Sequence, residues 1–258
     1  MNYFSTFAKI SNPKLFIMKK FLILVQVIGL ALLIACKSGG NGKGSSPEQP
    51  FGEESGIVTY KAMDASGVKV TQTMYFEDYG KKETHDMLVV GKMMDVEMRR
   101  HSVEMRDGNI VYYFELENMA GGQDQGQKAA YKTTLTPELF DEMSIVPISA
   151  ASKAKLDYKE EGKETIAGLE GVKFSVCPDS TNPQNRISGV HYKNILLKVT
   201  LPQMDIIAEK VELGVKVPAD KFKVPEGYTV VEQAVEQSQQ APAETPGDAP
   251  EENVRGRR

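Results

Sequence analysis

Apolar and polar residues alternate along the middle of the chain, which is the pattern of strands in a sheet with one buried face. In "VKVTQTMYF" every second residue shares one face, and that face carries Val68, Val70, Met74 and Phe76 with Gln72 among them. The same alternation recurs in "NIVYYFELEN" and "ILLKVTL", and "DIIAEKVEL" continues as another strand. Further strands are predicted over residues 56–61, 172–177 and 189–192.

Turn signals separate these strands, and helix signals are few. The predicted turns lie at residues 64–67, Asp107-Gly108, Glu161-Gly162 and Lys193-Asn194. The best helix begins at "TPELFDEM", with Thr136 as the N-cap, and is expected to run to about residue 146. The pattern therefore predicts a mainly β (α+β) domain: an antiparallel sheet with one or two short helices.

The N-terminus has the pattern of a secretory signal. Residues 21–35 form an apolar run of 15 residues interrupted by Gln26, which is short for a bilayer-spanning helix. Lys19 and Lys20 supply the positive flank that precedes such a run in signal peptides. We expect residues 1–35 to be a signal peptide, and because Met18 directly precedes the lysines, we expect it to be the true start.

The signal ends in "LIAC", residues 33–36, which resembles the lipobox of bacterial lipoproteins. That resemblance implies cleavage before Cys36, which then carries a diacylglycerol and an N-acyl chain that anchor the protein in a membrane. Residues 36–55 form the lipidated cysteine and a Ser/Gly-rich flexible tether. Lys37 and Ser38 in place of an aspartate favour the outer membrane. A transmembrane anchor or a cleaved, unanchored chain is the alternative.

The composition of the chain limits which partners it can bind and indicates where its folded domain ends. The formal net charge is −4, and removing residues 1–35, which hold four lysines and no acidic residue, leaves a more acidic chain. Such a chain is a poor binder of nucleic acid, which requires basic surface. Residues 56–232 are expected to form one domain, and the Gln-, Pro- and Glu-rich residues 233–258 a disordered tail. With Cys36 acylated, Cys177 is predicted to be a packed thiol.

The stretch 85–105 is rich in methionine and histidine. Thioether and imidazole groups suit Cu(I), and on a helix one face would carry Met94, Met98, His101 and Met105. The Asp107-Gly108 turn favours a strand instead, on which the histidine points away from the methionines. Methionines then either fill the core or line an adaptable apolar site. For the second case the predicted lining residues are Met94, Val96, Met98, Tyr112 and Phe114.

Catalytic and cofactor motifs are missing from the sequence, which lacks a Gly-x-Ser-x-Gly, a Cys-x-x-Cys, a phosphate-binding glycine loop and a metalloprotease helix. His85 and Asp86 are adjacent, and adjacent residues of a strand point to opposite faces, so they are a poor catalytic pair. We therefore expect a protein that is not an enzyme and has no metal or non-covalent cofactor.

Two stretches, "GKETIAGLEGVKFSV" and "GVHYKNILLKVTL", resemble envelope lipoproteins of a family whose domain has no assigned function. "YFEDYGKKE" and "FKVPEGY" fit the same family, and the wider similarity is to LolA-like lipoprotein carriers and lipid-binding lipoproteins. The resemblance implies an open, strongly curved half-barrel with helices against its concave apolar face. His191 stands where the family has a tryptophan, and no catalytic residues are carried over.

The alternating pattern and the resemblance together predict a sheet with more apolar surface than its helices can cover. We expect a monomeric, membrane-anchored envelope lipoprotein that binds a lipid, an acyl chain or another apolar ligand there. The alternative is a structural or interaction module with a filled core that docks a protein partner.

Overall fold

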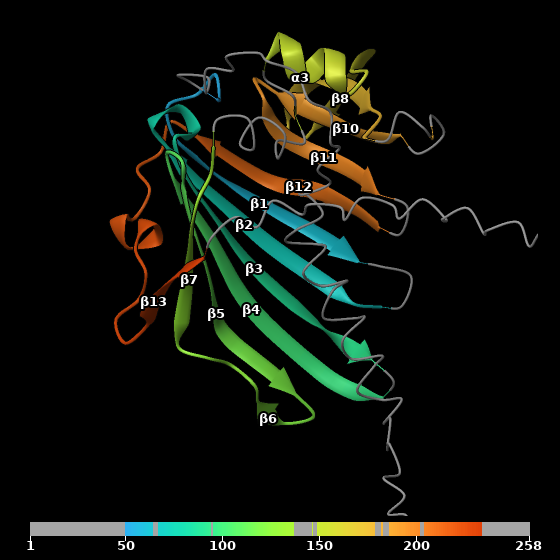
Figure 1. The fold of residues 1–258 in the computed structure, drawn as a ribbon. Coiled ribbons are helices and arrows are strands. Elements are labelled where there is room, and N and C mark those ends of the chain that lie inside the picture. The colour runs from blue at the N-terminus through green and yellow to red at the C-terminus, as the bar shows by residue number, and fades with distance from the viewer. Residues whose placement is uncertain are drawn as a thin grey trace, which may run out of the picture.

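The computed structural model describes residues 50–63, 67–93, 95–136, 146, 149–178, 182, 186–201 and 204–233, drawn in colour in Figure 1. The fold is mainly β, as the alternating pattern predicts: one open sheet of 13 strands that does not close into a barrel. The sheet is strongly curved (Figure 1). The predicted signal peptide, Cys36 and the predicted tail from residue 234 onward lie outside the described residues.

The elements are mostly strands, and we give them here in two groups. The first group consists of β1 (Gly56–Met63), β2 (Lys69–Glu77), η1 (Asp78–Gly80), β3 (Lys82–Met93), β4 (Val96–Asp107), β5 (Ile110–Ala120), β6 (Gln123–Asp124) and β7 (Ala129–Thr134). The second consists of α3 (Ala150–Lys155), β8 (Lys159–Ile166), β9 (Leu169–Val176), β10 (Ile187–Tyr192), β11 (Ile195–Leu201), β12 (Met204–Leu213), η2 (Ala219–Phe222) and β13 (Thr229–Gln233).

The strands follow one another across the sheet almost in chain order. The order is β13-β7-β5-β4-β3-β2-β1-β12-β11-β10-β9-β8, with β6 paired to β5 off this path. Most neighbours are consecutive antiparallel strands joined by short turns. Two long-range pairings complete the sheet: β1 with β12, and β13 with β7, which is parallel. The central strands β1 and β12 therefore join an N-terminal and a C-terminal set of hairpins.

Most strands predicted from the alternating pattern are present, and one predicted turn is wrong. Glu161-Gly162 does not end a strand; it lies inside β8, where the register shifts between Glu160 and Gly162 to form a β-bulge. The turn that joins β8 to β9 is instead Ala167-Gly168, both with positive φ. The helix predicted from residue 136 to 146 falls mostly on residues outside the described ranges.

The two faces of the sheet are named here by one buried residue each: the Tyr60 face and the Thr84 face. At the β8–β12 end the Tyr60 face is a filled core. Phe76, Val58, Ile195 and Leu197 are almost completely buried there, and side chains from the β8–β9 hairpin pack against their cluster. The helix α3 lies at this same end (Figure 1). Its N-cap is Ser149, whose side chain accepts a hydrogen bond from the backbone N–H of Ser152, the third residue of the helix.

The Thr84 face of β3–β7 is covered by residues 214–228, which we call the C-terminal segment. Thr84 donates a hydrogen bond of 2.8 Å to the carbonyl of Lys221 in η2. Tyr228 packs edge-to-face on Phe114, with ring centroids 5.5 Å apart, and donates to the carbonyl of Glu115 at 2.6 Å. The segment then continues into β13 along the edge of β7 (Figure 1). The chain itself therefore occupies the part of this face around Thr84 and Phe114, whereas Val90 on the same face is 38% exposed.

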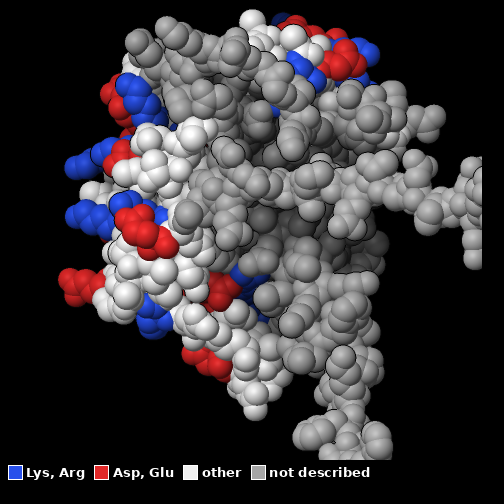
Figure 2. Space-filling model, in the orientation of Figure 1, with Lys and Arg blue, Asp and Glu red and all other residues white. Residues whose placement is uncertain are grey.

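Charged side chains of both signs are interspersed over the described surface seen in Figure 2. Several form exposed ion pairs, such as Lys61 with Glu209 at 2.6 Å and Lys163 with Glu170 at 2.6 Å. Exposed pairs of this kind contribute little to stability, typically ~0–1 kcal/mol. The surface charge therefore does not mark a site, and the polar groups that matter lie on the Tyr60 face.

Candidate binding face

The Tyr60 face changes from apolar to charged in the direction across the strands. The register aligns one row of side chains from β11 to β5: Val199, Ile206, Ala62, Val70, Val89, Arg100 and Asn118. A second row from β12 to β5 is Ala208, Tyr60, Gln72, Met87, Ser102 and Glu115. Each row begins with apolar residues and ends with polar ones on β4 and β5, so the face is amphipathic.

The apolar part of this face forms a continuous cluster, which we call the apolar stripe. Its members are Ala62, Val68, Val70, Met87 and Val89, with Met204 and Ile206 packed against them. Six of the seven lie on the Tyr60 face of the neighbouring strands β12, β1, β2 and β3, and Val68 directly precedes β2. Within the described residues, the helix α3 lies at the other end of the sheet (Figure 1). The methionine thioethers of the apolar stripe suit a ligand of irregular shape, because methionine side chains adapt their shape.

The register separates the lining residues that the sequence suggested. Val96 and Met98 lie on the Tyr60 face of β4, beside the apolar stripe, where Met98 pairs with Gly91 of β3. Tyr112 and Phe114 lie on the opposite face, because Phe114 pairs with Val103 and Tyr112 with Met105. Phe114 is 2% exposed under the C-terminal segment. The structure thus brings Val96 and Met98 to the candidate face, not Tyr112 or Phe114, and Met94 lies outside the described residues.

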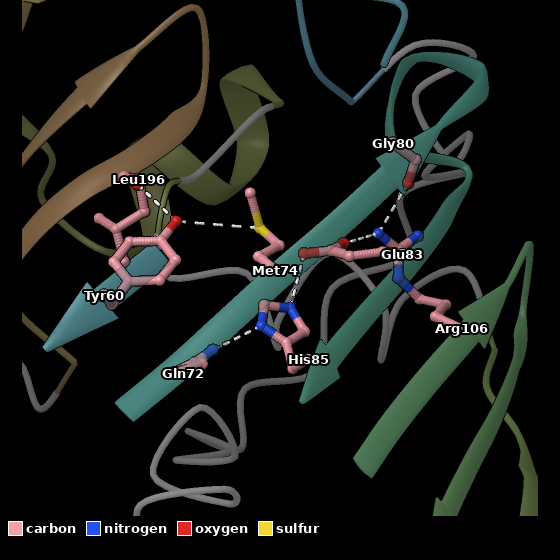
Figure 3. A network of polar contacts seen from close by, with 8 residues as sticks. All are labelled: Tyr60, Gln72, Met74, Gly80, Glu83, His85, Arg106 and Leu196. Carbon is pink, nitrogen blue, oxygen red and sulfur yellow. Dashed lines mark hydrogen bonds and ion pairs between the residues drawn. The ribbon is translucent and has the colours of Figure 1, made fainter. Parts of the chain in front are cut away.

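A network of polar side chains, here the Glu83 network, occupies the next rows of the same face (Figure 3). Arg106 donates to the carboxylate of Glu83 and, at 2.8 Å, to the carbonyl of Gly80. The Nε2 atom of His85 lies 2.7 Å from a Glu83 carboxylate oxygen. Its Nδ1 atom lies 2.6 Å from the side-chain amide of Gln72. Glu83 is therefore held by two basic groups, His85 on its own strand β3 and Arg106 on the neighbouring strand β4.

The surroundings of the Glu83 network shift its pKa values. Burial alone would raise the pKa of Glu83, but Arg106 and His85 more than offset it and lower the pKa to about 2. Burial likewise opposes the charged form of His85, yet Glu83 and Glu104 raise its pKa above the usual value. Glu104, which faces His85 across the strands, has a raised pKa because of its burial and the nearby Glu83. Glu83 is thus held as an anion, whereas burial works against the charged form of Glu104.

A second group, the Arg100 cluster, terminates the row that begins at Val199. Arg100 is only 7% exposed, and its Nε and Nη2 atoms donate to Glu115 at 2.5 Å and to the hydroxyl of Tyr113 at 2.6 Å. Asn118 donates to the other Glu115 oxygen at 2.8 Å. Burial raises the pKa of Tyr113 to about 12, so it stays a neutral hydroxyl. The cluster places a buried cation–carboxylate pair at the end of the apolar stripe.

The histidines do not gather into one site. His85 faces Glu83, whereas His101 lies on the Thr84 face with its Nε2 atom 2.6 Å from Asp86. This confirms the expectation that His85 and Asp86, adjacent on β3, point to opposite faces. Among the described residues, no group of three or more His, Cys, Asp or Glu side chains is arranged to hold a metal ion. The described part of the chain also contains no helix long and apolar enough to cross a membrane.

His191, which replaces the tryptophan of the resembling family, lies at the filled end of the sheet. Its ring lies against Tyr158 and Phe174, with centroid distances of 6.4 and 5.5 Å. The Tyr158 hydroxyl lies 3.0 Å from Nε2, and the buried Nδ1 atom has no hydrogen-bond partner among the described residues. Burial, aided by nearby Lys153, lowers the pKa of His191. His191 therefore packs against the aromatic rings of Tyr158 and Phe174 and is not a member of the apolar stripe.

Sequence reasoning missed the polar half of the candidate face, although two signals were present. Gln72 stands on the apolar face of its strand, which marks a polar partner there. The two-residue turn Gly108-Asn109 pairs Asp107 with Ile110, so from the turn to the register shift at His101/Ser102 odd-numbered residues of β4 share a face with even-numbered residues of β5. That rule separates Met98 from Tyr112 before any coordinates are known.

Comparison with known proteins yields fold-level matches only. No protein-family model matches the chain, and no curated protein matches it either. An uncharacterised conserved protein from Thermus thermophilus aligns at 9% identity over 70% of this chain and 91% of its own, with a TM-score of 0.44. The MucA/MucB complex of Pseudomonas aeruginosa aligns at 14% sequence identity over 69% of this chain and 58% of its own, with a TM-score of 0.40. PNGF-II aligns at 14% sequence identity over 70% of this chain and 32% of its own, with a TM-score of 0.36. At these values the likeness identifies neither a family nor an activity.

Proposed function

We propose that this chain is a lipid-anchored, non-enzymatic protein of the cell envelope that binds an acyl chain or another amphipathic molecule on its Tyr60 face. The observation that carries the proposal is the cross-strand row from Val199 to Arg100, which is apolar over five strands and then ends in a buried ion pair. A molecule with an apolar tail and a polar end has the same order of chemistry.

The apolar stripe supplies the affinity in this proposal. Val70, Met87 and Val89 are at most 8% exposed, so a ligand gains this contact only by displacing the groups that now cover them. Transferring ~300 Å² of apolar surface to the ligand is then worth several kcal/mol at ~25 cal/mol per Å². Met87 and Met204 give the stripe an adjustable lining, because an unbranched thioether adopts many shapes at low cost. A family of chain lengths is therefore a better expectation than one ligand of fixed shape.

The Arg100 cluster supplies orientation. Arg100, Tyr113 and Asn118 present hydrogen-bond donors beside the carboxylate of Glu115. An anionic end group on the ligand can accept from those donors in competition with Glu115, whereas a neutral polar end leaves the ion pair intact. Because a buried charge is costly without a partner, we expect the tail to supply affinity and the cluster to set the direction of the ligand.

Membrane attachment through Cys36 belongs to the same proposal. The tether predicted over residues 36–55 ends earlier in the structure, because Phe51 packs edge-to-face on Phe76 and Gly52 donates to the carbonyl of Lys193. The part between Cys36 and the first described residue, Pro50, is rich in Gly and Ser. A flexible chain of that length spans roughly 20 Å on average. The domain is thereby kept close to the membrane surface from which an acyl chain would come, and outer-membrane placement remains part of the proposal.

Photo-labelling tests the binding proposal directly. The full chain, purified from envelopes, is incubated with a palmitate analogue that carries a photoactivatable group in its tail, and labelled peptides are mapped by mass spectrometry. We expect labels on β2, β3 and β12 at the apolar stripe. Labels confined to other segments, or a label that excess palmitate does not displace, would contradict the proposal.

Val89 and Val90 offer a matched pair of variants. They are adjacent on β3 but face opposite sides, with Val89 in the apolar stripe and Val90 on the Thr84 face, 38% exposed. Val89→Gln is expected to reduce labelling at least ~10-fold, and Val90→Gln to leave it unchanged. Thermal unfolding of both variants shows whether the domain remains folded. Equal labelling of both variants removes the apolar stripe as the site.

A structural or interaction module is the second candidate, because the β8–β12 end of the Tyr60 face is already filled by the chain's own side chains. It predicts that Val89→Gln changes stability but no ligand occupancy. Cross-linking in intact envelopes, followed by identification of the captured partners, separates it from ligand binding.

A further inference from the structure

The two edges of the open sheet differ in chemistry. The edge strand β8 is highly charged, with the sequence "KEEGKETI", and it contains the bulge at Gly162. Charges and bulges are the features that keep an edge strand from pairing with another chain. The other edge strand, β13, has the sequence "TVVEQ" and exposes Val230 and Val231 by 49% and 39%. β13 thus lacks the protection that β8 has.

The backbone of β13 leaves two residues ready to pair outward. The N–H of Thr229 donates to the carbonyl of Lys128 at 2.9 Å, and β13 runs parallel to β7 with Thr229 opposite Ala129. Backbone groups alternate in direction along a strand, so those of residues 229, 231 and 233 point toward β7. Those of Val230 and Glu232 therefore point away from the sheet.

We propose that β13 pairs antiparallel with β13 of a second copy of this chain, centred on Val231. In that register Val230 of one copy lies opposite Glu232 of the second copy, and the reverse, so both outward-pointing residues form hydrogen-bonded pairs. Val231 then faces its own equivalent as the central non-hydrogen-bonded pair, where side chains approach most closely. The two sheets join into one continuous sheet with two-fold symmetry.

The charges on β13 permit this pairing. Glu232 is the only charged residue of the strand, and its carboxylate lies 2.8 Å from Lys132 of the same chain. The edge is thereby close to neutral, which suits an uncharged, β-branched partner strand such as β13 itself. The charged edge of β8 is a poor alternative, because pairing β13 with it would also generate an open filament rather than a closed dimer.

Other segments of this chain fit the edge less well. Residues 234–258 continue directly from β13 but contain prolines at 242, 246 and 250, which cannot donate to a ladder. The tether is rich in Gly and Ser, which weaken a strand. In the antiparallel pair the two tails leave from opposite ends and do not compete for the edge. A common membrane anchor, as proposed for Cys36, would raise the local concentration of copies.

Cysteine cross-linking in the membrane tests the register with a matched control. The central pair places two Val231 Cα atoms about 4.5 Å apart, within the range that a disulfide bridges. Two Val230 residues are offset by two positions along the strands, which places their Cα atoms about 8 Å apart and beyond that range. We expect the full-length V231C chain to give a disulfide-linked dimer in envelopes and V230C, although more exposed, to give at least ~10-fold less.

Charge substitutions supply a second readout in the wild-type cysteine background. Val231→Lys sets two ammonium groups against each other at the two-fold axis, whereas Val230→Lys places each ammonium opposite Glu232 of the second copy. Sedimentation of the full chain in detergent is expected to show a dimer that weakens at least ~10-fold in V231K and is retained in V230K. Neither substitution touches the buried core, and circular dichroism checks folding.

The proposal fails if V231C and V230C cross-link equally, or if V231C gives no dimer while wild-type sedimentation is independent of concentration. It also fails if mass spectrometry of the V231C product identifies a different protein as the partner, since the edge then belongs to another chain's strand. Loss of palmitate labelling has no bearing on this result, so the dimer and the ligand proposal are tested separately.

Discussion

Replacing Glu83 by glutamine tests how the Glu83 network stabilises the sheet. Glu83 joins β3 to β4 through Arg106 and lies beside His85 on its own strand. The substitution keeps the size of the side chain and removes only its charge. Any loss of stability therefore reports the electrostatic contribution rather than a packing defect.

The magnitude follows from the pKa of Glu83. Its side chain is 12% exposed, and its pKa is lowered from 4.5 to about 2. A depressed carboxyl pKa stabilises the folded state above the unfolded pKa, and this contribution is lost as the pH falls through the folded pKa. The difference corresponds to roughly 3 kcal/mol at neutral pH, present above about pH 4.5 and lost toward pH 2.

Urea denaturation at a series of pH values measures this contribution. At pH 7 we expect Glu83→Gln to unfold with about 3 kcal/mol less free energy than the wild type. As the pH falls from about 4.5 toward 2 the two curves should converge, because the unfolded carboxyl is protonated first and the folded wild-type carboxyl is protonated only near pH 2. Glu97→Gln is the control: its side chain is 79% exposed and lies 3.5 Å from Lys92, so a change within ~0.5 kcal/mol is expected at every pH.

The pH dependence decides the outcome. A Glu83→Gln variant that differs from the wild type by the same amount at pH 2.5 and at pH 7 would show that the loss does not come from the ionised carboxylate. A difference below ~0.5 kcal/mol at pH 7 would show that burial of Glu83 already cancels its attraction to Arg106 and His85.

Three further substitutions probe other parts of the fold by the same unfolding assay. His85 has a raised pKa, so its contribution is fully present below pH 6.5 and lost as the pH rises through the folded value; His85→Gln should remove that alkaline decline. His191 has a lowered pKa, so its contribution is present above pH 6.5 and lost as the pH falls; His191→Phe should remove that acid decline. Phe114→Ala should cost about 3–5 kcal/mol and expose the C-terminal segment to protease, while palmitate labelling persists.

The alternating pattern was sufficient to predict the central strands, because each has one buried face and one exposed face. Val68, Val70, Met74 and Phe76 are all buried on the Tyr60 face, as predicted. The edge strand β8 escaped prediction because both of its faces meet water, so its charged sequence shows no alternation and Gly162 reads as a turn rather than a bulge. Alternation reports burial on one face, not the presence of a strand.

The stretch 85–105 shows a second limit. The Asp107-Gly108 signal favours a strand over a helix there, and two strands are present, β3 and β4, with Asp95 in a turn between them. Asp95 adopts a positive φ of 65° without a glycine beside it, so the usual turn signal is missing. Pairings across that turn, such as Glu83 with Arg106, could not be predicted without the register.

The amphipathic character of the Tyr60 face follows from which hairpins are joined. β1 and β12 carry apolar residues on this face, the same row stays apolar through Val70 on β2 and Val89 on β3, and it becomes polar at Arg100 on β4. The register between neighbouring strands fixes these rows. A slip of one residue between β3 and β4 would therefore move Arg100, and also Arg106, the partner of Glu83, to the Thr84 face, which the C-terminal segment contacts. The buried ion pairs therefore oppose such a slip, and the same pairs set the polar end of the proposed ligand site. Stability of the register and direction of the ligand thus depend on one set of contacts.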